Sequence, residues 1–266
     1  MTELTDWYGK LSGQRTDACA LQMQAVLNAE SEDRGGSRPC HVAADDGQTY
    51  WIKQVNNPQS ARVPVTEQVI AACGLLIGAP VRETRLIGIP ADFEGEKLMN
   101  GTVLGQGIAH GSLNLEFAIF DKTWAPDHRD RDDNRRRHAA YFALFDWCWG
   151  DDRQWLYDSA EDLTMYSHDH GHFLPGAPDW SGETLRQAVD LERSLDTSPD
   201  GLDRHELIRV ANALEAMTTG PLLRILASIP ASWPVDDQEL EVLGWFLDCR
   251  RGPVAGRIRQ LAARLA

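Results

Sequence analysis

This 266-residue sequence lacks several marks of transmembrane, secreted and zinc-ribbon proteins. No apolar run approaches the roughly 20 residues that span a bilayer. Residues 1–6 lack the basic and apolar regions of a signal peptide. The five cysteines are odd in number, widely spaced and never in a C-x-x-C pair, which argues against a disulfide framework or a zinc ribbon. We therefore expect a cytoplasmic protein with reduced thiols.

Basic residues are also scarce. The sequence has 26 Lys and Arg against 40 Asp and Glu, a formal net charge of −14 at pH 7. An acidic surface repels phosphate backbones and anionic lipids, so neither nucleic acid nor membrane is expected as a main partner. Acidity does not exclude one nucleotide, because a triphosphate needs only a local set of donors and a metal ion. Nothing in the composition indicates the oligomeric state.

The first hundred residues carry the strand signals. Two β-prone runs flank the turn Asp45-Asp46-Gly47, which predicts a hairpin whose second strand ends at Lys53. Residues 65–77 have apolar side chains at helical spacing, and residues 81–89 return as a strand. These elements predict a compact unit over residues 1–100.

The rest of the chain differs in character. Residues 101–137 are expected to form a connector and a charged loop, because glycines are frequent before residue 113 and charged side chains dominate residues 126–137. From residue 138 the apolar spacing is helical, and residues 138–266 are expected to form a mostly helical lobe. The predicted fold class is α+β and bilobal, with a strand-rich N-terminal lobe, a helical C-terminal lobe and a cleft suited to a ligand.

Lys53 and Glu67 are the first candidates for chemistry. Lys53 stands at the end of an apolar strand, where a lysine is costly unless it faces an edge or an anionic partner. Glu67 follows fourteen residues later, near the start of the next helix. Separately, they read as an exposed strand residue and as a first-turn carboxylate favoured by the helix dipole. Together they match a strand lysine on nucleotide phosphates that a helix glutamate holds in place.

Two aspartates form the second candidate pair. Asp152 follows Asp151 at the end of a very apolar helix, where adjacent carboxylates require a positive partner. Asp169 stands two residues before Gly171, as a carboxylate at a tight turn able to hold a divalent cation. A solvated turn is the ordinary alternative for both. Their separation of 17 residues (169 − 152) is about that between the catalytic-loop and metal-binding aspartates of kinases.

The order and spacing of several short motifs resemble the small HipA-like kinases, distant relatives of the phosphatidylinositol 3/4-kinases and protein kinases. The motifs run through residues 33–175 and are Gly35-Gly36-Ser37-Arg38-Pro39, Asp45-Asp46-Gly47 with Tyr50 and Lys53, Asn57-Pro58-Gln59, Arg62-Val63 with Val65 and Glu67, Gly150 with Asp152-Arg153, and Asp169-His170-Gly171. The resemblance implies a protein-kinase-like fold with two lobes around ATP and magnesium. In the first motif, Gly36 and Ser37 would offer backbone N–H groups to phosphate.

The resemblance also implies roles for the two candidate pairs. Lys53 would contact the α- and β-phosphates, with Glu67 orienting it. Asp152 would orient the acceptor hydroxyl or take its proton, and Asp169 would hold Mg²⁺. The resulting hypothesis is an ATP-dependent kinase that phosphorylates a hydroxyl. Protein Ser or Thr, a small molecule and the chain itself all remain open as acceptors.

The catalytic loop departs from the family pattern. The family has a metal-binding asparagine five positions after the aspartate, and here that position is Tyr157. The run reads as if about three residues were lost, which leaves Gln154, or instead Asp158, as the second magnesium ligand. A pseudokinase that binds a nucleotide without transferring phosphate is therefore the alternative function.

Three histidines support a rival hypothesis, a metal-dependent hydrolase. On a strand His168, His170 and His172 would point to one face and offer three imidazoles to zinc. A strict i, i+2, i+4 set spans about 13 Å at strand rise, too far to close on one ion without a bend. His138 or His110 would then have to join the site.

Overall fold

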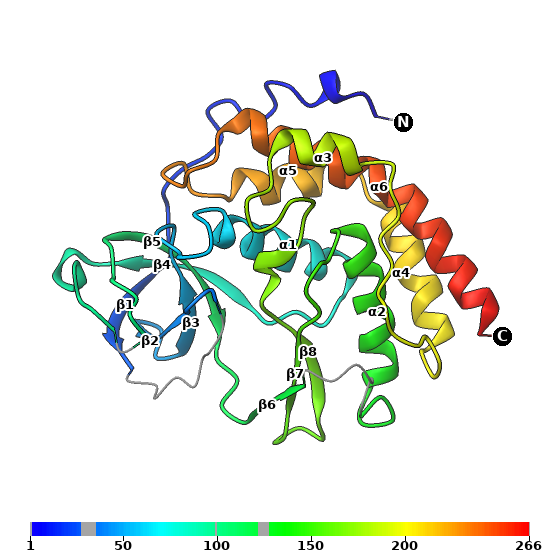
Figure 1. Cartoon of the computed structure of the whole chain (residues 1–266), viewed down its shortest axis with the longest axis horizontal. Helices are drawn as coiled ribbons and strands as arrows, with labels where there is room; N and C mark the ends of the chain where they lie inside the picture. Colours follow the sequence, from blue (N-terminus) through cyan, green and yellow to red (C-terminus); the bar gives the residue numbers. More distant parts are fainter. Residues whose placement is uncertain (1, 28–35, 99, 122–127, 266) are drawn as a thin grey trace.

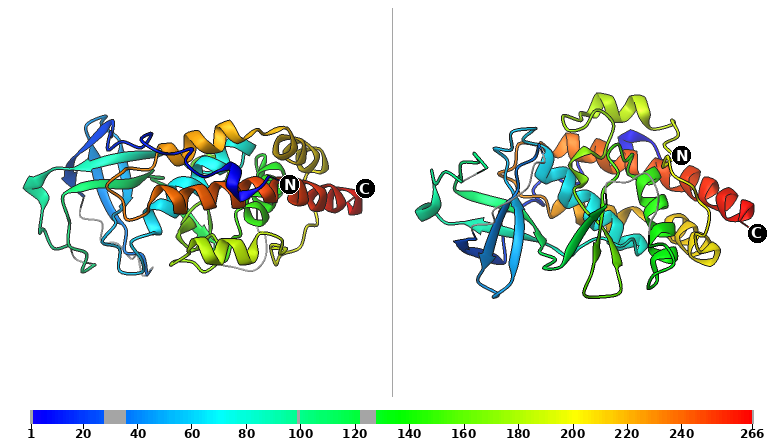
Figure 2. Two further views of the ribbon diagram at one scale, coloured as in Figure 1. Left: turned by 90° about the horizontal axis from the view of Figure 1, so that it is seen from above. Right: turned by 60° about the horizontal axis from the view of Figure 1, so that its bottom comes forward.

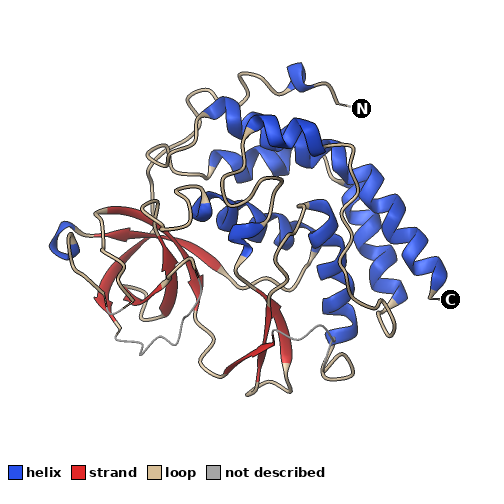
Figure 3. Cartoon of the chain, in the orientation of Figure 1, coloured by secondary structure: helices blue, strands red, loops and turns tan. Residues whose placement is uncertain are grey.

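A computed structural model describes residues 2–27, 36–98, 100–121 and 128–265 of the chain (Figure 1). Most strands gather at one end of the molecule and the helices at the other, while a smaller group of strands lies beside the helices, as the colouring by secondary structure shows (Figure 3). Two further views keep the same separation (Figure 2). The predicted mixed α+β class, with a strand-rich and a helix-rich part, is therefore confirmed.

The larger sheet is a closed barrel with the strand order β1-β2-β3-β5-β4. Its members are β1 Leu21–Val26, β2 Cys40–Ala44, β3 Thr49–Lys53, β4 Thr84–Ile89 and β5 Gly107–Leu113. The predicted hairpin is formed by β2 and β3, with Cys40 opposite Ile52. In its turn, the Asp46 carboxylate accepts hydrogen bonds from the Gln48 N–H at 2.9 Å and the Tyr50 hydroxyl at 2.7 Å.

The connector expected over the glycine-rich residues before 113 is wrong from residue 107 onward. Residues 107–113 form β5, which pairs with β3 on one side and β4 on the other. A Cβ atom at Gly111 would lie 2.5 Å from Ile87 Cδ1 and 3.3 Å from the Arg85 carbonyl oxygen. Gly111 therefore serves the close approach of two strands, although in the sequence it resembles the glycine of a loop.

The helices are α1 Val63–Ile77, α2 Asn134–Trp147, α3 Gly182–Ala188, α4 Arg204–Ala216, α5 Thr219–Ala227 and α6 Asp237–Arg264. Short 3-10 segments lie at Leu4–Asp6, Ala91–Phe93 and His170–His172. α2 starts at Asn134, four residues before the predicted start at His138, inside the expected charged loop. The buried Asn134 amide explains this start, since it donates to the carbonyls of His128 at 2.9 Å and Leu163 at 2.7 Å.

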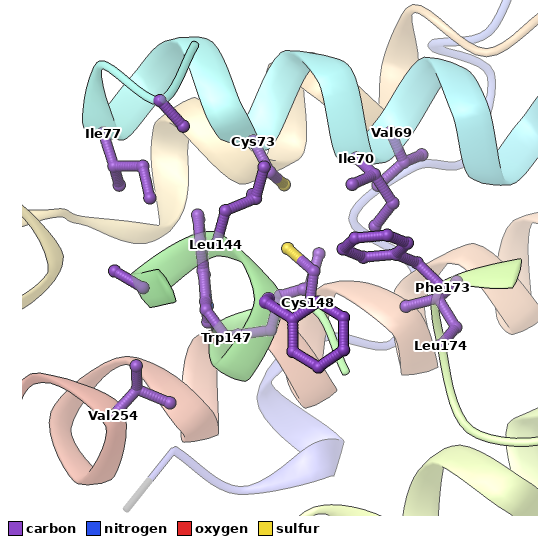
Figure 4. Packing of buried hydrophobic residues seen from close by; sticks show 14 of the residues in the cluster. Val69, Ile70, Cys73, Ile77, Leu144, Trp147, Cys148, Phe173, Leu174 and Val254 are labelled. Atoms are coloured by element: carbon purple, nitrogen blue, oxygen red, sulfur yellow. Dashed lines mark hydrogen bonds between the residues drawn. The ribbon is translucent and has the colours of Figure 1, made fainter. Parts of the chain in front are cut away.

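α1 lies among the helices, although it was predicted within the N-terminal unit. Val69, Ile70 and Cys73 on α1 belong to the same buried cluster as Leu144 and Trp147 on α2 (Figure 4). The barrel interior is a separate cluster made of its own strands. A boundary at residue 100 therefore coincides neither with an end of the barrel nor with a division of the core.

A second, small antiparallel sheet lies beside the helices. It consists of β6 Ala118–Asp121, β7 Trp155–Asp158 and β8 Thr164–Ser167 in that order. Ser167 at the end of β8 donates its N–H to the Pro80 carbonyl at 2.6 Å, just before β4. This bond ties the small sheet to the segment between α1 and the barrel. Within the described ranges, no helix is long and apolar enough to cross a membrane.

Gly111→Ala should destabilise the barrel. The added methyl must displace Ile87 and press on the Arg85 carbonyl, and overpacking of this kind costs about 1–3 kcal/mol. Gly105→Ala is the matched control, because its Cβ would have no neighbour closer than 3.6 Å. Urea denaturation measures both variants. Equal free energies of unfolding for the two would contradict the proposed role of Gly111.

Candidate active site

A buried ion-pair cluster joins β3, α1 and the turn after β8. Ile52 belongs to the barrel core, so the next residue, Lys53, points out of the barrel toward α1. There the Lys53 ammonium binds Glu67 Oε1, and it binds Asp169 Oδ1 at 2.5 Å. Lys53 is 8% exposed and Glu67 4%. The predicted pairing of Lys53 with Glu67 is therefore present, and Asp169 joins it.

Glu67 also holds the backbone of the turn that carries Asp169. Its carboxylate accepts hydrogen bonds from the N–H groups of His170 at 3.0 Å and Gly171 at 3.1 Å. Asp169 itself has φ 53°, in the left-handed region that few residues other than glycine adopt. Such backbone strain recurs at functional sites, where the surroundings fix it. The tight turn predicted at Asp169 is therefore present, and a helix carboxylate fixes it.

The cluster shifts the protonation of its members in opposite directions. Burial favours the neutral form of Glu67, but the Lys53 ammonium and His170 outweigh it and hold the pKa of Glu67 well below its usual range. Burial likewise opposes the charge on Lys53, yet Asp169 and Glu67 raise the pKa of Lys53. Opposite Lys53 on β5, burial lowers the pKa of His110 to about 4. At neutral pH Lys53 is therefore charged, Glu67 is ionised and His110 is uncharged.

The segment with Asp152 lies beside the segment with Asp169. Gly150 forms an antiparallel bridge with Phe173, and the His168 N–H donates to the Gln154 carbonyl at 3.4 Å. The two segments are thus joined at both ends, although Asp152 and Asp169 are 17 residues apart in the sequence (169 − 152). Asp152 is exposed.

The turn from α2 into this segment leaves no room for a side chain at Gly150. A Cβ atom there would lie 2.3 Å from Phe145 Cδ2. The Gly150 N–H donates to the Phe145 carbonyl at 2.7 Å, and Trp149 before it has φ 56°. Gly150 therefore sets where the following aspartates emerge.

Of the two residues considered as a second metal ligand, only Gln154 lies near Asp152. Its side-chain amide donates to Asp152 Oδ2 at 2.5 Å. Asp158 is wrong as the substitute ligand: it pairs with Thr164 at the far end of the β7–β8 hairpin and accepts from the Ala160 N–H at 2.9 Å. β7 starts at residue 155, so each further residue along this strand moves away from Asp169.

The three-histidine zinc site is wrong. Residues 170–172 form a 3-10 turn and not a strand, so the alternation expected of a strand does not apply. His168 packs edge-on against Phe120, His170 shares a 2.7 Å hydrogen bond with Ser167 Oγ, and His172 hydrogen-bonds to Gln59 at 2.9 Å.

The other two histidines do not complete such a site. His138 receives a hydrogen bond from Arg129 at 3.1 Å and His110 bonds to Gln68 at 2.9 Å, each at its Nδ1 atom. In the part of the chain that the structure describes, no group of three His, Cys, Asp or Glu side chains is arranged to hold a metal.

Gly36 and Ser37 lie on the barrel side of the cluster. The Ser37 carbonyl accepts from the Asn57 side chain at 2.8 Å, and the Gln59 side chain packs against Gly36. Gln59 in turn reaches His172, which follows the Asp169 turn. The Gly36–Ser37 turn is therefore connected to the site through Gln59. Gly35 of the same motif lies outside the described residues.

The oxygen donors at the hairpin end suit magnesium better than zinc. Asp169, Asp152 and the amide oxygen of Gln154 are hard ligands of the kind that Mg²⁺ selects. Asp169 and Gln154 occupy facing ends of the two adjacent segments. These residues fit a magnesium ion that substrate phosphates help to bind, whereas they offer zinc no nitrogen or sulfur ligand.

Sequence reasoning missed two members of this neighbourhood. Gln59 was quoted in a motif but given no role, and the structure places it between Gly36 and His172. The positive partner expected for the paired aspartates is Arg193, which binds Asp151 from 42 residues away (193 − 151). No local signal in the sequence marks Arg193, since the contact depends on the fold.

Glu67→Gln should destabilise the protein in a pH-dependent way. Removing one charge of a buried pair costs about 3 kcal/mol when, as here, the remaining ammonium keeps a second carboxylate. The folded pKa of Glu67 lies below the ordinary value of 4.5, so its contribution is complete above that pH and falls as the pH drops toward the folded pKa.

Urea denaturation from pH 3 to pH 8 tests this expectation. The difference in unfolding free energy between wild type and Glu67→Gln should be constant above about pH 5 and narrow below it. Glu215→Gln, at an exposed carboxylate on α4 that pairs with Arg259, is the matched control and should show little difference throughout. A constant difference down to pH 3 would contradict the ion-pair account.

Comparisons with known proteins find the fold but no close relative. No family model matches the sequence, and no curated protein matches it. Among solved structures, the fold is similar to that of CtkA, a proinflammatory kinase of Helicobacter pylori, with a TM-score of 0.59 and 12% sequence identity. The alignment covers 95% of this chain and 99% of the CtkA chain. The fold of this protein is thus similar to that of a kinase over nearly its whole length.

Proposed function

We propose that this protein is an ATP-dependent kinase of the HipA-like type, which transfers the γ-phosphoryl group to a hydroxyl of an acceptor. The observation that carries the proposal is the Lys53 ammonium bound to both Glu67 and Asp169. Protein kinases use a strand lysine that a helix glutamate holds, together with a turn aspartate that binds Mg²⁺. The similarity of the fold to a kinase supports the same proposal.

The barrel would then be the small lobe above the nucleotide, and the helices with the small sheet the large lobe. In this arrangement Lys53 contacts the phosphates from the barrel side, and Glu67 keeps its ammonium extended. The backbone N–H groups of Gly36 and Ser37 face the phosphates from the preceding turn. Water is excluded at the base of the site, because Lys53 and Glu67 are almost fully buried.

The acceptor side of the reaction falls to Asp152. Its exposed carboxylate would accept a hydrogen bond from the acceptor hydroxyl, orient it toward the phosphorus atom and take its proton. Asp169, with Gln154, would hold Mg²⁺, which neutralises the negative charge of the β- and γ-phosphates. Lys53 and Asp169, which bind each other in this structure, would contact the phosphates and the metal respectively.

A pseudokinase is the second candidate function, and one observation favours it. The position at which the family has its metal-binding asparagine is Tyr157, which is fully buried in β7 and shares a 3.4 Å contact with His138. Gln154, the remaining candidate, hydrogen-bonds to Asp152 itself. A protein of this kind would bind ATP and transfer no phosphate.

Asp169→Asn should abolish magnesium-dependent ATP binding. The amide keeps the shape of the side chain but is a far weaker ligand for Mg²⁺, and Lys53 retains Glu67 as its buried partner. Calorimetry with and without magnesium measures the effect. Asp179→Asn, at an exposed aspartate outside the site, is the control and should bind as wild type does. Unchanged magnesium-dependent binding in Asp169→Asn would remove Asp169 from the site.

Lys53→Met is a less clean test, because the structure shows Lys53 as the buried partner of Glu67. Removing it leaves a carboxylate uncompensated and costs about 3–5 kcal/mol. Loss of activity in this variant would therefore mix a lost phosphate contact with lost stability.

Phosphoryl transfer by wild type, Asp152→Ala and Gln154→Ala separates a kinase from a pseudokinase and tests the roles of the two residues. Removing the carboxylate at the acceptor should slow phosphoryl transfer by about 10²–10⁴-fold, at any magnesium concentration. Gln154→Ala should lower the rate of phosphoryl transfer by less, and a raised magnesium concentration should restore part of that rate. Turnover is measured with γ-labelled ATP across a magnesium titration, with the protein and a cell extract as acceptors. ATP binding by wild type without any transfer would establish the pseudokinase instead.

A further inference from the structure

We propose that Arg193 is a positioning residue that fixes Asp152 for the reaction by clamping the backbone in front of it. The inference rests on the proposed function and assigns a role to a residue that no motif marks. Arg193 lies in the irregular segment between α3 and α4, far from the site in the sequence. The proposal follows from what its guanidinium group contacts.

Arg193 binds the two residues immediately before Asp152. Its Nε–H donates to the Gly150 carbonyl at 2.6 Å, and its Nη2 donates to Asp151 Oδ1 at 2.5 Å. The guanidinium carbon lies 5.8 Å from the ring centre of Phe145 and 5.9 Å from that of Trp149. One side chain therefore contacts the end of α2, the turn after it and the first aspartate.

The same irregular segment supports the chain on the other side of Asp152. Arg153 donates from Nη1 to the Asp196 carbonyl oxygen. Between the two contacts, Leu195 is buried in the helical core and anchors the segment. Asp152 is thus flanked by Gly150 and Arg153, which are both held by residues 193–196.

Of the two Arg193 bonds, the one to the Gly150 carbonyl carries the clamp. The Asp151 side chain is 63% exposed, and exposed ion pairs contribute little because water screens them. Gly150 is buried, and its carbonyl accepts a charge-assisted bond from a planar group that the aromatic rings orient. A lysine at position 193 would keep the positive charge but lose the fork that reaches both partners.

The clamp adds to two contacts that join the ends of this segment to the Asp169 segment, the bridge from Gly150 to Phe173 and the bond from the His168 N–H to the Gln154 carbonyl. Asp152 is exposed, and the turn before it depends on Trp149 in the left-handed region. The bridge from Gly150 to Phe173 fixes one point of the backbone but not the direction in which Asp152 emerges. A displacement of about 1 Å at a reacting group costs roughly 100-fold in rate.

The test compares Arg193→Ala with Arg193→Lys, Asp151→Asn and the control Arg186→Ala, an exposed arginine on α3. Arg193→Ala should lower the turnover number roughly 100-fold. The dissociation constant of ATP measured without magnesium should stay unchanged, because Lys53 and Glu67 are untouched. Added guanidinium ion at millimolar concentration should restore part of the rate. The turnover number of Arg193→Lys should lie between those of wild type and Arg193→Ala. The turnover numbers of Asp151→Asn and Arg186→Ala should stay within about threefold of wild type.

Hydrogen exchange of the backbone amides in residues 150–154 gives a readout that does not require activity. Arg193→Ala should speed exchange there and leave α2 and the barrel unchanged. If wild type transfers no phosphate, the proposed function fails, and the exchange data decide on the clamp alone. If the amides of residues 150–154 in Arg193→Ala exchange at the wild-type rate, the proposed clamp is overturned. If Asp151→Asn lowers the turnover number as much as Arg193→Ala does, the assignment of the clamp to the Gly150 carbonyl is overturned. If Arg193→Ala lowers ATP affinity and the turnover number by equal factors, Arg193 has only a structural role.

Discussion

The buried Glu67 carboxylate is the interaction on which the candidate site depends. It receives the Lys53 ammonium from the barrel and two backbone N–H groups from the turn after β8. A charge with 4% of its residue surface exposed is stable only when it is paired and hydrogen-bonded, so these partners are required and not incidental. One carboxylate on α1 therefore joins the barrel, the helical core and the turn that carries Asp169.

This dependence explains why α1 lies in the helical core and not with the strands that precede it. Its apolar residues pack against α2, which fixes the height of Glu67 relative to the turn that carries Asp169. The end of α2 in turn leads through Gly150 into the segment with Asp152. Packing between two helices thus sets the relative positions of the residues that would bind phosphate and those that would bind the acceptor.

The segment between α2 and β7 has a clear structural form. β7 starts directly after Gln154, so only Arg153 and Gln154 lie between Asp152 and the sheet. Tyr157 fills the core there and cannot also reach a metal ion. The remaining loop is short, exposed at Asp152 and supported from outside by residues 193–196.

The sequence by itself determined the local elements and the residue types of the site. The Asp-Gly turn of the first hairpin, the helix after it and the spacing of Lys53, Glu67, Asp152 and Asp169 all follow from short-range patterns. Local rules failed at Gly111 and Asn134. There a glycine serves strand contact and a charged run conceals the start of α2, because packing against distant residues decides both.

Only the tertiary structure decided which residues meet. The union of Lys53, Glu67 and Asp169, the separate partners of the three histidines and the contacts of Arg193 all join segments that lie far apart along the chain. Periodicity reports whether a residue faces the core, but not which residue it faces there. That pairing depends on how the elements pack, and packing is a property of the whole chain.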